Sequence, residues 1–362
     1  MGLEIQKVEK SVGREVYLKD IALSLAPGSR NIILGHTLAG KTSLLRIIAG
    51  LDKPTQGRIL LGGKDVTGVT VRKRSVAMVY QQFINYPSLT VYQNIASPLK
   101  LARIAPSEID RRVRRTAEML HIDNLLDRLP AELSGGQQQR TAIARALVKE
   151  SQLLLLDEPL VNLDYKLREE LRVELQQIFE QRSAIVVYTT TEPAEALMLG
   201  GNIVIMDEGR ILQTGPTYEV YRHPATTRVA EIFSDPPINF ISARVRQKQA
   251  RLSEIIRMPL AGHINDLPEG DYTFGVRCNH LRLNATSAAD LEIRAVVELS
   301  ELNGSETFIH VKYGDQKMVV QENGVHQFKI GTPISVYVNP CHFFVYDPKG
   351  HLAASPEQAC YA

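Results

Sequence analysis

Residues 31–43 read Asn31-Ile32-Ile33-Leu34-Gly35-His36-Thr37-Leu38-Ala39-Gly40-Lys41-Thr42-Ser43, and this stretch decides the fold of the chain. An apolar strand leads into a G-x-x-x-x-G-K-T spacing and an apolar helix follows, which is the pattern of a phosphate-binding P-loop. Gly35 and Gly40 let the backbone curl so that its N–H groups face phosphate oxygens at a helix N-terminus. Lys41 then brings a positive charge to the outer phosphates, and Thr42 offers a hydroxyl to magnesium. A glycine-rich turn with a chance lysine is the simpler alternative.

A second motif points to the same chemistry. Residues 153–156 are four consecutive leucines, and Asp157 and Glu158 follow them. An apolar run of this length is typical of a parallel strand that is covered on both faces. Asp157 is placed to hold magnesium, and Glu158 is placed to orient and activate the water that attacks the terminal phosphate. With a P-loop upstream, a merely solvated acidic strand end is a poor alternative.

Between these motifs lies Ser134-Gly135-Gly136-Gln137, at the start of a helical stretch over residues 138–148. Exposed N–H groups at a helix start form an anion site. Together with the P-loop, this motif resembles the signature of the ABC-type ATPase family. The resemblance implies that Ser134 to Gln137 close on ATP held by the P-loop of a second subunit. It therefore implies a head-to-tail dimer with ATP and Mg²⁺ as cofactors; an ordinary helix cap is the alternative.

Two further segments resemble landmarks of the same family. Gln81 resembles the glutamine that touches magnesium and senses the transmembrane subunit, although Gln82 is adjacent and is the alternative for this role. Asp164, in Asn162-Leu163-Asp164, resembles the loop that crosses the dimer interface. The resemblance covers essentially the first two-thirds of the chain.

Composition limits the other function classes. The 362-residue chain has a net charge of +2, so nothing in its charge balance favours a nucleic-acid partner. Four arginines between residues 111 and 115 fit a solvated helix face better than a nucleic-acid surface. Residues 1–5 lack the pattern of a secretory signal, and no apolar run approaches the length of a membrane span. Three widely spaced cysteines, Cys278, Cys341 and Cys360, indicate free thiols rather than a disulfide framework.

The periodicity predicts two domains. Residues 1–235 are expected to form an α/β P-loop nucleotide-binding domain, with a helical subdomain at about 86–150. After Asp235-Pro236-Pro237, short strands separated by turns predict an all-β, OB-like domain over 236–362. This second region also resembles the OB-like domain of carbohydrate-importer ATPases, through Phe274 to Leu281 and Leu302 to Thr307. Because the chain has 6% aromatic residues and no tryptophan, binding of single-stranded nucleic acid by the barrel is the weaker reading.

The chain departs from its family at the switch position. Thr191 stands where family members usually place a histidine that contacts the γ-phosphate. A threonine hydroxyl is shorter and cannot carry the positive charge of an imidazolium. We therefore assign Thr191 to the catalytic site, and we expect that threonine in place of histidine slows ATP hydrolysis at this chain's own site.

Two other departures concern nucleotide binding. Inside the P-loop, His36 and Leu38 replace the proline and the small residue that are common in the family, although the spacing of the motif is retained. Val12, before Gly13, occupies the position where an aromatic residue often stacks on the base. Tyr17 is a candidate substitute, and stacking is worth roughly 1–3 kcal/mol.

These departures favour a heterodimer with a second ABC ATPase that has an intact switch, while a homodimer in which Glu158 works unaided remains the alternative. Residues 79–92 resemble ATP-binding subunits of bacterial carbohydrate and polyol importers. The run Thr189-Thr190-Thr191, the P-loop that contains Leu38 and residues 235–240 resemble those of glycerol importers in particular. The resemblance implies two membrane permease subunits, a periplasmic solute-binding protein and a peripheral place on the cytoplasmic side of the inner membrane. The alternatives are a soluble ABC ATPase acting on nucleic acid or ribosomes, an inactive regulatory partner, and an exporter ATPase.

Overall fold

The computed structural model describes residues 2–82, 84–161, 163–180, 182–253, 256–357 and 360, so Phe83 and Asn162 of the segments above lie outside the described residues. The chain divides into two compact units, Met1–Thr217 and Tyr218–Ala362. The sequence pattern predicts a boundary after residue 235, whereas the structure divides earlier, after Thr217. Each unit is described by itself below.

A six-stranded sheet forms the centre of the first unit. Its order is β10-β9-β3-β8-β7-β6, and all neighbours are parallel except β10 and β9. The strands are β3 (Arg30–Leu34), β6 (Val76–Val79), β7 (Leu153–Asp157), β8 (Ile185–Thr190), β9 (Asn202–Asp207) and β10 (Arg210–Pro216). Every residue of β7 and β8 is buried, as expected for central parallel strands. The carboxyl ends of β3, β7 and β8 therefore lie side by side.

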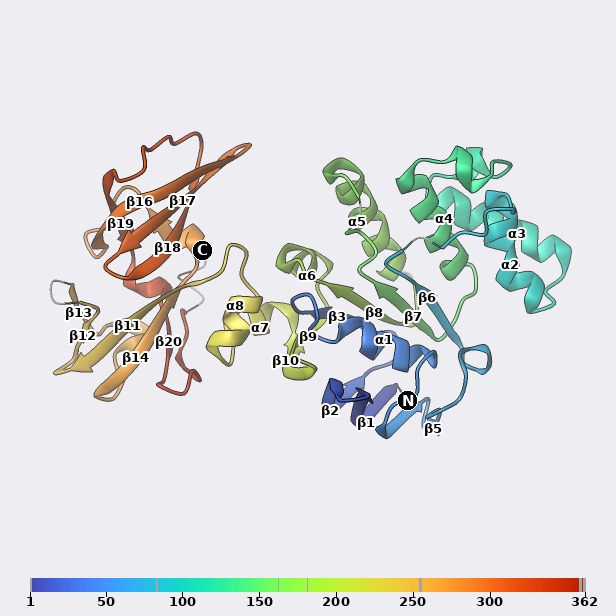
Figure 1. Ribbon diagram of the computed structural model, residues 1–362, viewed down its shortest axis with the longest axis horizontal. Helices are drawn as coiled ribbons and strands as arrows, with labels where there is room; N and C mark the ends of the chain where they lie inside the picture. The colour runs from blue at the N-terminus through green and yellow to red at the C-terminus, as the bar shows by residue number, and fades with distance from the viewer. Residues whose placement is uncertain are drawn as a thin grey trace. The chain divides into compact units, whose positions relative to one another are not determined.

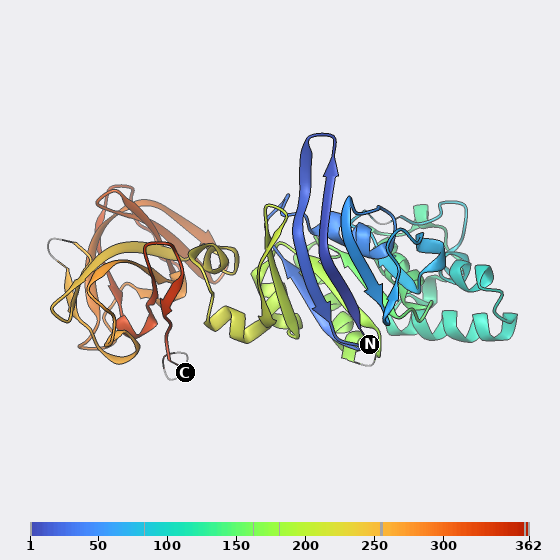
Figure 2. The same cartoon turned by 90° about the horizontal axis from the view of Figure 1, so that it is seen from below.

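A second, antiparallel sheet has the order β2-β1-β4-β5. It consists of β1 (Leu3–Val12), β2 (Glu15–Leu25), β4 (Gln56–Leu61) and β5 (Lys64–Asp65). Helix α1 (Lys41–Ala49) buries its apolar face in one core with residues of this sheet and of the central sheet. The hairpin of β1 and β2 extends beyond the rest of the sheet (Figure 2).

The helices of the first unit form two groups (Figure 1). Helices α5 (Tyr165–Glu180) and α6 (Pro193–Leu199) cover the face of the central sheet opposite α1. Helices α2 (Val91–Leu101), α3 (Pro106–Met119) and α4 (Gly135–Leu147) form the expected helical subdomain. Thr90 caps α2 by accepting a hydrogen bond from the Gln93 amide, and α3 starts on a proline, which needs no N–H donor there.

The second unit begins with two short helices, α7 (Thr217–Arg222) and α8 (Thr227–Ile232). They pack on the β domain that follows: the guanidinium of Arg277 stacks 3.6 Å from the centre of the Tyr221 ring. Ala230 joins a buried cluster with Phe344 and Tyr346. These contacts explain why the segment before residue 235 belongs to this unit.

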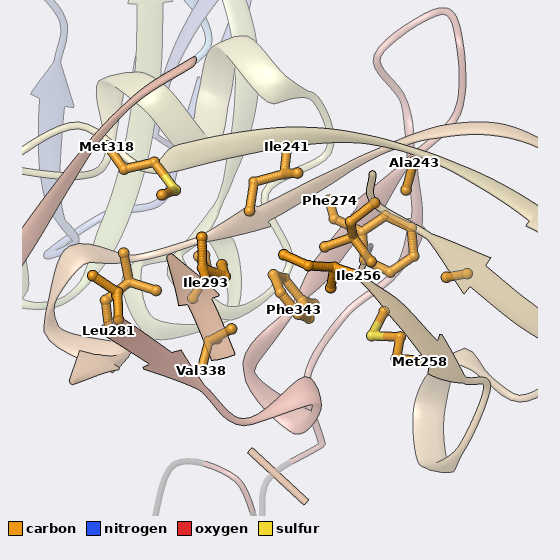
Figure 3. Close-up of a cluster of buried hydrophobic side chains, with 14 of the residues drawn as sticks. Ile241, Ala243, Ile256, Met258, Phe274, Leu281, Ile293, Met318, Val338 and Phe343 are labelled. Carbon is orange, nitrogen blue, oxygen red and sulfur yellow. The ribbon is translucent and has the colours of Figure 1, made fainter. Parts of the chain in front are cut away.

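The rest of the second unit consists of two antiparallel sheets. The first, in the order β13-β12-β11-β14-β20-β21, contains β11 (Asn239–Arg246), β12 (Gln249–Arg251), β13 (Arg257–Pro259), β14 (Gly270–Val276), β20 (Phe344–Tyr346) and β21 (Leu352–Ala354). The second, in the order β15-β19-β16-β17-β18, contains β15 (Leu281–Arg282), β16 (Leu291–Asn303), β17 (Glu306–Tyr313), β18 (Gln316–Asn323) and β19 (Pro333–Val338). Side chains from both sheets meet in one apolar core (Figure 3). In this core the rings of Phe274 and Phe343 contact edge to face, with their centres 5.5 Å apart. The prediction of an all-β second domain is confirmed.

Candidate active site

The P-loop connects β3 to α1 and depends on both of its glycines. Gly40 has a φ of 98°, and a Cβ atom there would lie 2.9 Å from the carbonyl oxygen of Tyr17. A Cβ at Gly35 would lie 2.3 Å from the carbonyl oxygen of Met206. Both positions therefore exclude a side chain, and Gly40 also needs a backbone conformation that favours glycine. Leu38 points to solvent with 93% of its surface exposed.

Lys41 is held inside the curve of this loop. Its ammonium group donates to the carbonyl oxygens of Gly35 at 2.8 Å and His36 at 3.0 Å, and it lies 3.1 Å from Glu158 Oε1. Only 4% of the Lys41 surface is exposed. Lys41 at the start of α1 thus forms a nearly buried ion pair with Glu158, which directly follows β7. Glu158 is the carboxylate expected to activate water.

Thr42 and Asp157 form the candidate magnesium site. The Thr42 hydroxyl donates to Asp157 Oδ1 at 3.0 Å, and burial raises the pKa of the Asp157 carboxyl. Hydroxyl and carboxylate oxygens are hard ligands of the kind that Mg²⁺ prefers, and few protein ligands suffice because this ion keeps several waters. A bound cation stabilises the charged form of a buried carboxylate more than that of an exposed one. Thr42 and Asp157 therefore fit a magnesium ion.

Gln81 reaches the same cluster. Its amide donates to Glu158 Oε2 at 3.4 Å, across 77 residues of sequence. The side chain of Gln82 is exposed and has no hydrogen bond or ion pair with another described residue. Of the two candidate glutamines, Gln81 is the one beside the carboxylates, and its assignment to magnesium and coupling stays a prediction.

Ser134 to Gln137 cap α4. The Gln137 amide donates to Ser134 Oγ at 3.4 Å, and the Ser134 amide donates to Gln137 Oε1 at 3.0 Å, which makes a reciprocal capping box. Ser134 and Gly135 are exposed, whereas Gly136 is buried against Leu167. Within the described part of the chain, no hydrogen bond or ion pair joins residues 134–137 to residues 35–43. The exposed end of α4 is thus available to a ligand held elsewhere.

The base-stacking candidates lie on the β1–β2 hairpin. Val12 is 58% exposed and Tyr17 is 41% exposed, so both can face a ligand. The Tyr17 hydroxyl donates to Glu15 at 2.7 Å, and this carboxylate raises the pKa of the phenol. The backbone of Tyr17 lies beside the P-loop, because its carbonyl oxygen is close to Gly40. This position favours Tyr17 over Val12, and the contact with the base stays a prediction.

Thr191 follows the end of β8, which lies between the P-loop strand and the strand that ends at Asp157. It thus lies at the carboxyl end of β8, and its role as the switch residue stays a prediction. Its side chain makes no hydrogen bond with another described residue. Asp164 is exposed and caps α5, because its carboxylate accepts from the Leu167 amide at 3.0 Å.

Two features of the site were not predicted from the sequence. Thr189 is hydrogen-bonded both to Asp157 and to the Glu158 amide. A hydrogen-bond network behind the switch joins helices α5 and α6 to β8. Its residues are the buried Arg172, Tyr188 and Glu195 and the partly buried Arg168 and Glu192. The only available signal for Thr189 was a hydroxyl at a buried strand position, and its meaning depends on strand register.

Comparisons with known proteins agree with this geometry. A family model described as ABC transporter matches residues 18–161, and one described as TOBE domain matches residues 274–345. The trehalose/maltose import ATP-binding protein MalK of Thermococcus litoralis is 36% identical, with 96% of this chain and 97% of that protein covered. The sn-glycerol-3-phosphate import ATP-binding protein UgpC 3 of Rhizobium etli is 37% identical, with 92% of this chain and 94% of that protein covered.

A solved structure extends the comparison to the fold. It is a dimeric, post-hydrolysis ATP-binding cassette with bound ADP and phosphate, 29% identical, with a TM-score of 0.54. The match covers 59% of this chain and 98% of that one. The expected fold and the expected use of ATP with Mg²⁺ are confirmed. This chain belongs to the ABC transporter family of ATP-binding ATPases and carries a TOBE domain after its nucleotide-binding domain.

Proposed function

We propose that this chain is the ATP-hydrolysing subunit of an importer for a sugar or polyol. The observation that carries the proposal is that Lys41, Asp157 and Glu158 lie together at the carboxyl end of the central strands. The chain also matches import ATP-binding proteins over nearly its whole length. Among the described residues, no helix combines the length and apolarity needed to cross a membrane. Because its relatives are import ATP-binding proteins, the proposal places the chain on the cytoplasmic side of the inner membrane, against two permease subunits.

In this proposal the P-loop amides and Lys41 bind the phosphates, and Glu158 orients the attacking water. Bound magnesium, held by Thr42 and Asp157 with Gln81 nearby, would neutralise charge that develops on the phosphates. Ser134 and the Gly135 amide would complete the site of a second subunit from across a dimer interface that Asp164 borders. Closure and reopening of this dimer would drive the permeases.

We further propose that the second subunit is a different ABC ATPase. The support is an asymmetry within this chain: its signature residues are all present, whereas Thr191 lacks the charge of an imidazole. ATPase turnover should be measured for the chain alone, with the candidate partner, and for Thr191→His. The heterodimer predicts low turnover that rises with the partner and with Thr191→His. Full turnover by the chain alone, unchanged by that substitution, would favour the homodimer.

For the transported solute we propose glycerol, within the wider class of polyols and sugars. The support is the resemblance to glycerol importers of the run Thr189-Thr190-Thr191, of the P-loop that contains Leu38 and of residues 235–240. The two relatives above are named for trehalose/maltose and for sn-glycerol 3-phosphate. The test is uptake of radiolabelled glycerol, maltose and glycerol 3-phosphate by cells with and without this chain. Loss of glycerol uptake alone supports the proposal, and loss of either other solute alone contradicts it.

A further inference from the structure

Thr189 lies in β8 directly opposite Asp157 of the parallel strand β7. Its side chain is fully buried. From its two hydrogen bonds we infer that Thr189 is a positioning residue for ATP hydrolysis, which holds both acidic residues of the site through one hydroxyl. This inference rests on the proposed function and explains how Glu158 is kept in place where Thr191 replaces an imidazole.

The hydroxyl has a distinct partner for each of its roles. It donates its single hydrogen to Asp157 Oδ1 at 2.9 Å and accepts the Glu158 amide N–H at 3.0 Å. The carbonyl oxygen of Leu156 lies farther away, at 3.4 Å. Because the carboxylate is charged and closer, it is the favoured acceptor.

For Asp157, the second hydroxyl matters once magnesium is bound. Oδ1 accepts from both Thr42 and Thr189, while Oδ2 has no hydrogen bond to a described residue. If Thr42 gave its oxygen to the ion, Thr189 would be the hydroxyl that still holds the carboxylate. Such support from behind a ligand typically changes metal affinity by about 10–100-fold.

For Glu158, the same hydroxyl fixes the backbone. Glu158 has a φ of 42°, a conformation that residues other than glycine rarely adopt. The hydrogen bond from its amide to Thr189 holds this turn, and the side chain then points to Lys41 at 3.1 Å and Gln81 at 3.4 Å. Glu158 is thus held from β8 by a hydrogen bond that does not involve residue 191.

Matched substitutions distinguish a positioning role of Thr189 from the simpler case of a buried hydroxyl that only needs hydrogen-bond partners. Thr189→Val removes the hydroxyl and keeps the shape, whereas Thr189→Ser keeps the hydroxyl. Thr307→Val is the control, since Thr307 is equally buried in a strand of the other domain. Among the described residues, its hydroxyl bonds only to the Gly324 carbonyl and the His326 amide. Three quantities are measured at a temperature where every variant is folded. They are kcat and KM for ATP at this chain's own site, with a partner whose catalytic glutamate is replaced by glutamine where a partner is needed, and the affinity of the ADP complex for Mn²⁺ by paramagnetic resonance.

We expect Thr189→Val to lower kcat by at least about tenfold, with KM for ATP changed less than about threefold, and to weaken Mn²⁺ binding by about tenfold. Thr189→Ser should restore both quantities, and Thr307→Val should change neither. Wild-type kcat and Mn²⁺ affinity in Thr189→Val would overturn the inference, as would equal loss in Thr189→Ser. If the wild-type chain hydrolyses no ATP even with its partner, the proposed function fails, while the Mn²⁺ comparison still decides the role of Thr189.

Discussion

Lys41 Nζ lies 3.1 Å from Glu158 Oε1, and only 4% and 15% of the two side chains are exposed. A charge pair with so little solvent around it is screened far less than a surface pair. The phosphates of ATP must therefore compete with Glu158 for the lysine. The same carboxylate that orients water also weighs against the binding of a negatively charged ligand.

Glu158→Gln should tighten MgATP binding several-fold while it lowers hydrolysis by about 10²–10⁴-fold. The neutral amide releases Lys41 to the phosphates and removes a repelling charge, but it cannot accept a proton from water. A fluorescent ATP analogue measures the affinity, and phosphate release measures the rate. Glu150→Gln, an exposed carboxylate outside the site, is the control. Weaker ATP binding in Glu158→Gln would contradict this view of the ion pair.

The two signature glycines should respond differently to alanine. A Cβ at Gly136 would lie 1.9 Å from Leu167 Cδ2, whereas a Cβ at Gly135 meets no atom within 4 Å. Gly136→Ala should therefore lower the melting temperature. Gly135→Ala should preserve it, because alanine is the better helix former by about 1 kcal/mol, yet it should reduce turnover by crowding the partner's phosphates. Equal effects of both substitutions on the two measurements would count against a second-subunit role for Ser134 and Gly135.

Leu38→Gly should leave nucleotide affinity unchanged and stabilise the fold by about 0–1 kcal/mol. Leu38 has a φ of 71° and is almost fully exposed, so glycine relieves a backbone cost of about 1–2 kcal/mol and loses little packing. Part of that gain is offset by the greater freedom of glycine in the unfolded chain. Leu38→Ala is the matched control, because it keeps the φ penalty and should leave stability unchanged. Urea unfolding measures both variants, and a loss above about 1 kcal/mol in Leu38→Gly would refute the argument.

Glu195→Gln should stabilise the chain relative to wild type increasingly as pH rises from 4.5 to 8. Burial raises the pKa of Glu195, and the charge of Glu192 adds to this shift. The hydrogen bond with Thr190, the charge of Arg172 and the hydrogen bond with Tyr188 oppose it only in part. A raised pKa means that the folded state favours the protonated acid, so the wild type loses stability as pH rises through that pKa. Melting temperatures at constant ionic strength test this. Glu118→Gln, an exposed glutamate with no ion pair to a described residue, should show a flat difference, and a Glu195→Gln difference that falls with pH would contradict the prediction.

Local sequence patterns were enough to predict the P-loop and the central sheet. The backbone nest needs glycine at two positions a few residues apart, and both Gly35 and Gly40 occupy sites that exclude a side chain. The four leucines of β7 are buried without alternation, as a central parallel strand requires. Such signals are contained in one short window of sequence.

The rest of the site depends on distant parts of the chain. Thr189 reaches Asp157 across 32 residues, and a shift of one residue in the register of β7 and β8 would turn its hydroxyl away. In the second domain, β11 gives a weaker local signal than β7. In β11, Arg244 and Arg246 alternate with buried residues, so the strand has one exposed polar face. It therefore lacks a continuous apolar run, and it follows a pair of prolines.

The central claim is that ATP lies between two subunits, and a structure of Glu158→Gln trapped with MgATP tests it most directly. The account predicts that Gly35 to Thr42 of one subunit hold the phosphates while a serine–glycine signature from the other subunit contacts the γ-phosphate. With a partner ATPase present, Ser134 and Gly135 of this chain should contact the partner's ATP. A triphosphate fully enclosed by a single chain, with Ser134 turned to solvent, would contradict the account.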